Sequence, residues 1–319
     1  MGVKTRWGGS DHTIGAFPAE SHRVRPENPD GCLNAANERT RQVPRLRTFI
    51  RPVMTGLLLG VFAAEAASAQ GRLDARYTVT LAGIKLGEGS WVIDVGDDQF
   101  SAVASGATAG LARVFSSGQG TGASRGTIKN SQLVPASYSA SIKSGRKSED
   151  VQISLQAGAV KDFSITPPSP DSPGRIPVTD AHRRNVTDPM TGSMLRVPGN
   201  GDLMAPDVCR QHTAIFDGRI RYDLTLAFKR LERVKVRGYE GPALVCAIYF
   251  NPLAGHVPDR AAIKYLIEQR DIETWLVPIA GTRVLVPIKV SIPTPLGMGV
   301  MEATQFNATP GPSRASITR

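Results

Sequence analysis

Residues 209–246 read CRQHTAIFDGRIRYDLTLAFKRLERVKVRGYEGPALVC. Polar and apolar residues alternate through residues 219–229 and again through 231–236, which is the period of a strand with one buried face. Turn sequences lie on either side, at Asp217-Gly218 and in the segment Gly238–Pro242. Residues 244–250, LVCAIYF, are apolar enough for a central strand. This stretch therefore predicts neighbouring antiparallel strands.

The same period of two extends outward from this stretch in both directions. Further strands are expected near residues 75–81, 90–95, 100–103, 118–128, 136–142, 150–155, 160–165, 283–292 and 299–306. Short strands separated by turns at even intervals are typical of an antiparallel meander with one buried face. We therefore predict an all-β, mainly antiparallel fold, a curved sheet that is barrel-like or sandwich-like, with one or two short helices.

Two segments are candidates for those helices. Thr187-Asp188-Pro189 has the form of a helix start, because Thr or Asp can cap the first turn and Pro suits a position inside it. Residues 261–268 can form an amphipathic helix or the start of a strand that runs to residue 277. The proline-rich segment 166–179 is expected to be a surface loop.

The first 69 residues differ in character from the rest. Residues 1–41 are polar without a periodic apolar face, so they are interpreted as a disordered segment or a mis-called extension. Residues 42–69 have the basic, apolar and Ala-x-Ala order of a signal peptide; the alternative is an uncleaved membrane anchor. We predict export to the periplasm, no transmembrane segment after processing, a single β-rich domain over residues 70–307 and a flexible tail over 308–319.

The charge of the chain bears on its partners. The formal net charge is +10, and residues 70–319 carry 29 Lys/Arg and 22 Asp/Glu, which leaves +7 after processing. A basic surface attracts anionic lipid head groups or nucleic acid. The basic residues are scattered and do not alternate with aromatic residues, so nucleic acid is not an expected partner. A lipid or another component of the cell envelope is the expected partner.

Four short motifs stand out in the second half of the chain. They are Phe216-Asp217-Gly218-Arg219-x-Arg221-Tyr222-Asp223, Gly238-Tyr239-x-Gly241-Pro242-Ala243-x-x-Cys246, Pro252-x-Ala254-Gly255-His256 and Thr294-Pro295-x-Gly297. With these motifs the chain resembles an exported proteobacterial family, the proteins that carry domain of unknown function 3108. The resemblance covers residues 74–306. It implies a mostly antiparallel β domain in the cell envelope, and it implies no activity, because the family has no assigned chemistry.

Catalysis has one candidate motif. Residues 122–126, GASRG, fit the G-x-S-x-G nucleophile motif around Ser124, but that motif needs a strand, a sharp turn and a helix, and here the strand pattern continues. An esterase would pair Ser124 with His182, His212 or His256 and a carboxylate. The three histidines are far apart in the sequence and lack the close spacing that is typical of metal ligands. We assign no catalytic residue, metal or cofactor, and a serine esterase-like hydrolase remains the alternative function.

A binding role has a different candidate site. Arg219, Arg221 and Tyr222 fall on one predicted strand, where they can bind an anionic head group. The alternative is that these residues belong to the charged solvent face of a half-buried sheet. Curled antiparallel sheets commonly hold ligands. The leading interpretation is therefore a non-enzymatic envelope protein that binds a lipid-like or amphipathic ligand, and a purely structural envelope protein is a further possibility.

The cysteines give the last prediction. Cys32 lies upstream of the expected cleavage site, so processing leaves Cys209 and Cys246 as an even pair in an oxidising compartment. We predict a disulfide between them. The alternative is two free thiols that act as small apolar side chains in the core.

Overall fold

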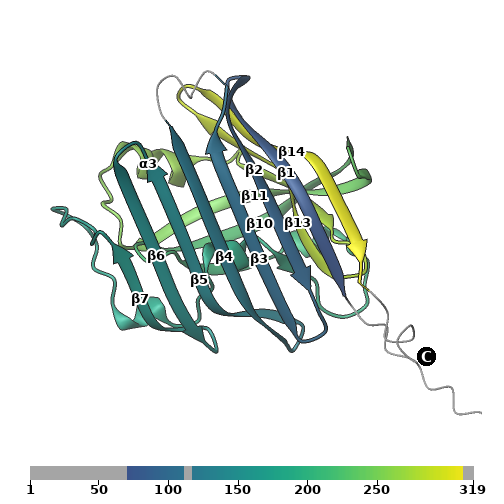
Figure 1. The fold of residues 1–319 in the computed structure, drawn as a ribbon, viewed down its shortest axis with the longest axis horizontal. Helices are drawn as coiled ribbons and strands as arrows, with labels where there is room; N and C mark the ends of the chain where they lie inside the picture. Colours follow the sequence, from purple (N-terminus) through teal and green to yellow (C-terminus); the bar gives the residue numbers. More distant parts are fainter. Residues whose placement is uncertain (1–69, 111–116, 312–319) are drawn as a thin grey trace, which may run out of the picture. The chain divides into compact units, whose positions relative to one another are not determined.

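The computed structural model describes residues 70–110 and 117–311. The predicted signal peptide, the segment before it and residues 312–319 lie outside these ranges. The described chain forms one 14-stranded sheet in which neighbouring strands are antiparallel (Figure 1). Across the sheet the order is β7 (Ala159–Thr166), β6 (Lys147–Gln156), β5 (Gln132–Ser144), β4 (Gly118–Lys129), β3 (Gln99–Thr108), β2 (Ile84–Val95), β1 (Gly71–Leu81), β14 (Gly297–Pro310), β13 (Val284–Thr294), β12 (Glu273–Pro278), β11 (Tyr239–Ala254), β10 (Arg221–Val236) and β9 (His212–Phe216).

A few short elements complete the described chain. Strand β8 (Leu195–Arg196) pairs with β13 beside the main path of the sheet. The helical elements are the 3₁₀ helices η1 (Asp180–Arg183) and η2 (Pro206–Cys209) and the α-helices α2 (Pro189–Gly192) and α3 (Ala261–Glu268). The predicted all-β, mainly antiparallel fold class is confirmed. The sheet is curved but not closed into a barrel, because β7 and β9 end the strand order without pairing to each other.

Several element boundaries differ from the sequence-based expectation. Residues 219–229 and 231–236 were expected as two strands, but β10 is one strand with a bulge between Phe228 and Arg230. The bulge absorbs the break in alternation, so the chain needs no turn there. Strand β14 runs to Pro310 and pairs with β1, so residues 308–310 belong to the sheet and not to the predicted tail. Residues 261–268 form the helix α3.

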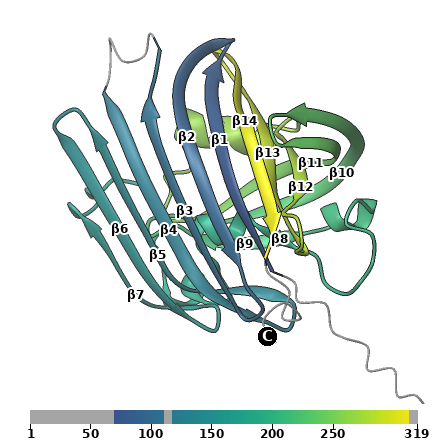
Figure 2. The ribbon, with the colours of Figure 1, turned by 45° about the vertical axis from the view of Figure 1, so that its right-hand side comes forward.

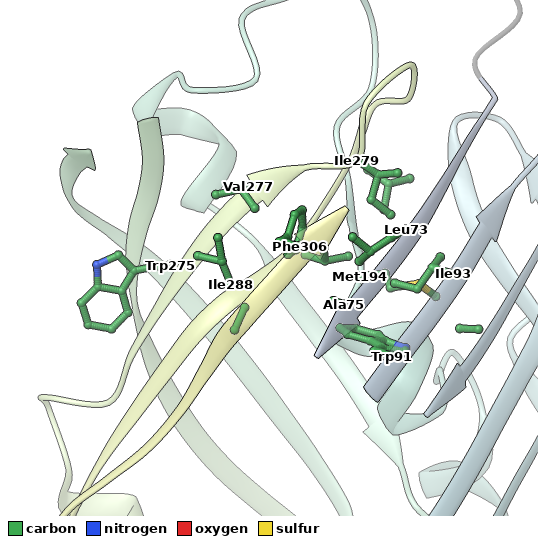
Figure 3. Packing of buried hydrophobic residues seen from close by; sticks show 14 of the residues in the cluster. Leu73, Ala75, Trp91, Ile93, Met194, Trp275, Val277, Ile279, Ile288 and Phe306 are labelled. Carbon is green, nitrogen blue, oxygen red and sulfur yellow. The ribbon is translucent and has the colours of Figure 1, made fainter. Parts of the chain in front are cut away.

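The core lies between the two parts of the curved sheet. Strands β1–β7 form one layer, and β10–β13 cross behind it (Figures 1 and 2). Leu73 of β1 and Ile93 of β2 are fully buried with Val277 of β12 and Phe306 of β14, and these side chains belong to one apolar cluster (Figure 3). Each such fully buried side chain stabilises the fold by about 1.5–3 kcal/mol relative to its exposed state.

The two ends of the sheet meet through side chains. Val151 and Ile153 of β6 pack against Phe216 of β9 in a second buried cluster. The ring of Phe163 in β7 contacts the ring of Phe216 edge to face, with their centroids 5.4 Å apart. Arg219, just before β10, forms an ion pair with Glu149 of β6. The sheet therefore curls until its first and last strands touch, and packing takes the place of a β-ladder at this junction.

A short segment before α2 fills this junction with backbone hydrogen bonds. The Val186 N–H donates to the carbonyl of Gly158 in the β6–β7 turn, at 2.8 Å. The Thr187 N–H donates to the Ala214 carbonyl of β9, and the Phe216 N–H donates back to the Thr187 carbonyl, both at 2.9 Å. Residues 186–187 thus act as a partial strand beside β9, which satisfies backbone groups that an open edge would leave exposed.

One glycine permits a close approach of β4 and β5. The register shifts between Arg125 and Gly126, where β4 passes Pro135 of β5. A Cβ at Gly126 would lie 2.2 Å from the carbonyl oxygen of Val134 and 2.8 Å from the ring of Phe100. Both separations are well below van der Waals contact, so this close approach requires a residue without a side chain.

The predicted disulfide is present. Cys209 of η2 and Cys246 of β11 are bonded, with their Cα atoms 5.7 Å apart. Both residues are fully buried in an apolar cluster with Leu244, Leu276 and Leu285. The bond attaches the segment before β9 to β11 and closes a loop whose ends are 37 residues apart.

Replacing both cysteines, Cys209→Ala and Cys246→Ala, should lower the free energy of unfolding by about 4 kcal/mol, because the unfolded chain regains the entropy of the opened loop. Urea denaturation measures this change. A reductant should destabilise the wild-type protein to a similar degree and leave the double variant unaffected. Equal sensitivity of both proteins to reductant would contradict the assignment of the stabilisation to this bond.

Candidate functional site

A groove of about 850 Å³ lies on the outer face of strands β1–β5, the face that points away from the core. Its volume lies within the range of small-molecule sites, about 300–1,000 Å³. The side chains in its lining are mostly small or polar. They are Asp74, Arg76, Thr78, Glu88, Ser90, Val92, Ser105, Ala107, Gln119, Thr121, Ser141, Lys143 and Thr304.

A row of hydroxyl groups crosses the groove. Strand register places Ser90, Ser105, Thr121 and Ser141 side by side, one residue from each of β2, β3, β4 and β5. The hydroxyls of Ser90 and Ser105 are hydrogen-bonded at 2.9 Å. Neighbouring strands lie about 4.8 Å apart, so the row extends over about 14 Å. It offers a line of groups that both donate and accept hydrogen bonds.

The rows on either side of the hydroxyls have different chemistry. On one side, Val92, Val103 and Ala123 lie in register across β2, β3 and β4, and Val103 is half exposed. On the other side, register places Glu88 beside Ala107 and Gln119 beside Lys143. The outer face therefore carries an apolar row, a hydroxyl row and a polar row next to one another. Such a surface matches a ligand with one apolar and one polar side.

The groove exists because the outward positions carry small side chains. Successive residues of a strand point to opposite faces, so every second residue of β3, β4 and β5 lies on the outer face. In the sequence these positions read Ser, Val, Ser, Ala over 101–107 and Ser, Ser, Ser over 137–141. The period of two within one strand does not indicate this row of hydroxyls, which becomes visible only when the outward residues of neighbouring strands are aligned.

Charges of both signs flank the hydroxyl row. Arg76 and Lys143 are cationic, Asp74 and Glu88 are anionic, and all four line the groove. Neither sign dominates the lining, so the electrostatics favour a neutral or zwitterionic polar group over a strongly charged one.

Each residue that the sequence placed in a common binding site has a partner of its own in the structure. Arg219 lies in the turn before β10 and pairs with Glu149. Arg221 is buried at the start of β10 and pairs with Asp223, whose carboxylate also contacts His212 Nε2 at 3.1 Å. The ring of Tyr222 packs against Phe250, with 5.4 Å between centroids, and burial raises the pKa of its phenol. The side chains of Arg219, Arg221 and Tyr222 do not line the outer groove.

The Ser124 hydroxyl is engaged by residues of α2. Its side chain is buried, and it lies 3.0 Å from Asp188 Oδ2 and 2.9 Å from the Thr191 hydroxyl. Ser124 lies within β4 and is not followed by a helix, as a nucleophile motif of this kind requires.

None of the three histidines of the esterase hypothesis is hydrogen-bonded to Ser124, whose hydroxyl contacts Asp188 and Thr191. His182 contacts Thr179, and His212 contacts Asp223. His256 is buried, and its Nδ1 has no hydrogen-bond partner among the described residues. A serine nucleophile needs a base within hydrogen-bond reach. The hydroxyl of Ser124 instead holds α2 against β4.

Asp188 is the centre of that attachment. Its Oδ1 accepts the N–H groups of Met190 and Thr191, both at 2.9 Å, so Asp188 is the N-cap of α2, one of the two candidates that the sequence offered beside Thr187. Its Oδ2 accepts the Thr191 hydroxyl at 2.7 Å as well as that of Ser124. The carboxyl group is fully buried. Burial raises its pKa, although the hydrogen bonds from Thr191, Ser124 and Met190 act in the opposite direction.

This raised pKa predicts a pH-dependent effect of Asp188→Asn. As pH rises above the ordinary range of an Asp carboxyl, the unfolded chain ionises before the folded protein does, so the wild-type protein loses stability. The Asn variant keeps the cap without this loss. Its free energy of unfolding relative to wild type should therefore rise with pH and level off above the folded-state pKa, as measured by urea denaturation.

Asp188→Ala is the control for this experiment. It removes the cap and leaves two buried hydroxyls without their acceptor, so it should be less stable than wild type by about 3 kcal/mol. A difference between the Asn variant and wild type that stays constant with pH would show that ionisation of Asp188 does not affect folding.

Two further properties concern ions and membranes. In residues 70–110 and 117–311, no group of three or more His, Cys, Asp or Glu side chains is placed to hold a metal ion. Over the same residues, no helix has the length and apolar character needed to cross a bilayer.

A family described as "Protein of unknown function (DUF3108)" matches residues 76–304. The chain belongs to this family. The match confirms the family resemblance that the four motifs indicated. It also covers the strands that form the groove, residues 186–192 and both cysteines of the disulfide in this DUF3108 protein. No curated protein matches the sequence.

One solved structure is similar to this DUF3108 protein. It is a beta-barrel-like protein of domain of unknown function DUF1849 from Brucella abortus. The sequences are 8% identical, the TM-score is 0.40, and the similarity covers 75% of this chain and 98% of that one.

Proposed function

We propose that this DUF3108 protein is an exported, non-enzymatic protein of the cell envelope that binds an amphipathic ligand along its outer groove. The observation that carries the proposal is the register of β2–β5, which sets a row of hydroxyls beside a row of apolar side chains. The hydroxyl row forms hydrogen bonds with the polar part of the ligand, and the row of Val92, Val103 and Ala123 contacts its apolar part.

The chemistry of the lining narrows the ligand class. Serine and threonine hydroxyls donate and accept equally well, so they suit a neutral, hydroxyl-rich or amide-rich group. The balanced charges at the margin do not favour a strongly anionic group. A lipid-like ligand with an uncharged polar head agrees with both features. The ligand is expected on the outer face of the sheet, because the inward side chains pack against one another and fill the inner face.

The groove also supports a binding role over a hydrolytic one. Its lining includes hydroxyls but neither a histidine nor a cysteine. The hydroxyl of Ser90 is bonded to another hydroxyl, that of Ser105, and not to a base. An unactivated serine is a weak nucleophile.

Export to the periplasm is supported by two independent features. Residues 42–69 have the order of a signal peptide. The disulfide between Cys209 and Cys246 forms and persists in oxidising compartments, whereas such bonds are rare in the cytosol.

Filling the groove should abolish ligand binding. Thr121→Trp places a large side chain in the hydroxyl row, and the matched control Ser154→Trp changes an exposed outward residue of β6 that is outside the groove lining. Native mass spectrometry of protein purified from the periplasm should show a co-purified amphipathic molecule with wild type and with the control. It should be absent from Thr121→Trp.

Two results would contradict this proposal. One is wild-type protein that carries no small molecule and binds none from an extract of envelope lipids. The other is equal loading of Thr121→Trp and Ser154→Trp, which would place the ligand elsewhere on the protein.

N-terminal sequencing of the exported protein tests the localisation. The mature chain should begin at Gln70 or within a few residues of it, because Ala67-Ser68-Ala69 has the small residues of a cleavage site. A first residue upstream of Val53 in protein recovered from the periplasm would mean that the apolar segment is retained.

A further inference from the structure

Two neighbouring hairpins expose large apolar side chains at their turns. The β1–β2 turn and the β13–β14 turn are in contact, since the Ala82 N–H donates to the Met298 carbonyl at 2.9 Å. Leu296 is 75% exposed, Ile84 is 54% exposed and Met298 is 44% exposed. We call these three side chains the apolar tip. None of them belongs to the buried clusters of the core.

The apolar tip is held in place by its own turn. The Thr294 hydroxyl donates to the Gly297 carbonyl at 2.7 Å and accepts the Leu296 N–H at 3.2 Å. A Cβ at Gly297 would lie 2.8 Å from the Cβ of Ala82, so the two turns pack closely. Leu296 therefore projects from a fixed turn, and little conformational entropy is lost when it enters an apolar environment.

A basic turn lies at the same end of the sheet. Strands β1, β5 and β13 run in the same direction, so the β5–β6 hairpin turns at the same end as the apolar tip (Figure 2). Lys143, Arg146 and Lys147 are exposed around this turn. They form no ion pair with any residue of the ranges 70–110 and 117–311. We call these three residues the basic turn.

We propose that this end of the sheet binds the surface of an anionic lipid bilayer. The apolar tip enters the boundary between head groups and acyl chains, and the basic turn contacts anionic head groups. Proteins that lie on membranes combine these two elements, exposed apolar side chains and nearby Lys or Arg. Each basic side chain near an anionic surface adds favourable electrostatic energy that salt screens.

Charge complementarity selects a membrane over a protein partner. The three cations of the basic turn have no ion-pair partner among the described residues, and the net charge of residues 70–319 is +7, so an anionic plane attracts this end of the molecule. The proposal does not depend on the ligand of the groove. The two surfaces are nevertheless adjacent, because Lys143 belongs both to the basic turn and to the groove lining.

Hydrogen exchange of the full chain with lipid vesicles locates the contact. Vesicles of phosphatidylcholine that contain phosphatidylglycerol should protect residues 80–86, 142–148 and 292–299, whereas pure phosphatidylcholine vesicles should protect them much less. This local measurement separates the contact from any binding by the apolar segment 53–64. Absence of protection in all three segments would overturn the proposal.

Vesicle flotation with matched variants tests the two elements separately. Arg146→Glu with Lys147→Glu should weaken binding by about fivefold or more for each side chain. The control, Lys129→Glu with Lys161→Glu, makes the same charge change near turns at the opposite end of the sheet and should bind as wild type does. Leu296→Ser with Met298→Ser should weaken binding by about tenfold or more, because it removes two exposed apolar side chains.

If the basic-turn variant and its control lose vesicle binding to the same extent, the loss is due to net charge alone, and the proposed contact is overturned. Unchanged flotation of the Leu296→Ser, Met298→Ser variant, together with loss of a co-purifying protein, would also overturn it, since that result assigns the apolar tip to a protein partner.

Discussion

The structure depends on one constraint, that a single sheet buries its own apolar face. The described helices are short, and none of them covers the inner face of the sheet from end to end. Strands with a period of two expose an apolar face unless another layer covers it. The sheet therefore curls until β1–β3 face β11–β13 and β6 reaches β9. Residues 186–192 complete this arrangement, because they bond to both ends of the sheet and place Asp188 and Thr191 beneath β4.

The same alternation that builds the core also determines the outer surface. Each residue that points inward separates two that point outward, so the small outward residues of β3–β5 come into register when the inward residues pack. The outer face carries serine, threonine and alanine where larger residues would fill the groove. The groove thus follows from the register that the core requires.

Local patterns in the sequence predicted most of the strands, the turn at Gly238, a helix start capped by Thr187 or Asp188, and the disulfide. They were not sufficient for contacts between distant strands. Nothing in the periodicity of β6 or β9 indicates that Val151 packs on Phe216, since that contact depends on the curvature of the whole sheet. The predicted binding residues show the same limit. The period of two does not indicate that the strand starts at Arg221, which leaves Arg219 in a turn, or that the ring of Tyr222 packs against Phe250.

The two proposed surfaces are separate from the interactions that stabilise the fold. The buried clusters, the disulfide and the Asp188 hydrogen bonds stabilise the fold, whereas the apolar tip and the groove-lining residues other than Tyr77 lie outside those clusters. An exposed apolar side chain at a turn contributes little to folding, because it is in contact with water in both the folded and the unfolded state. Substitutions at Leu296, Met298 or Thr121 should therefore change binding while leaving the denaturation midpoint nearly unchanged. This separation allows binding to be measured in variants that still fold, which a site within the core would not.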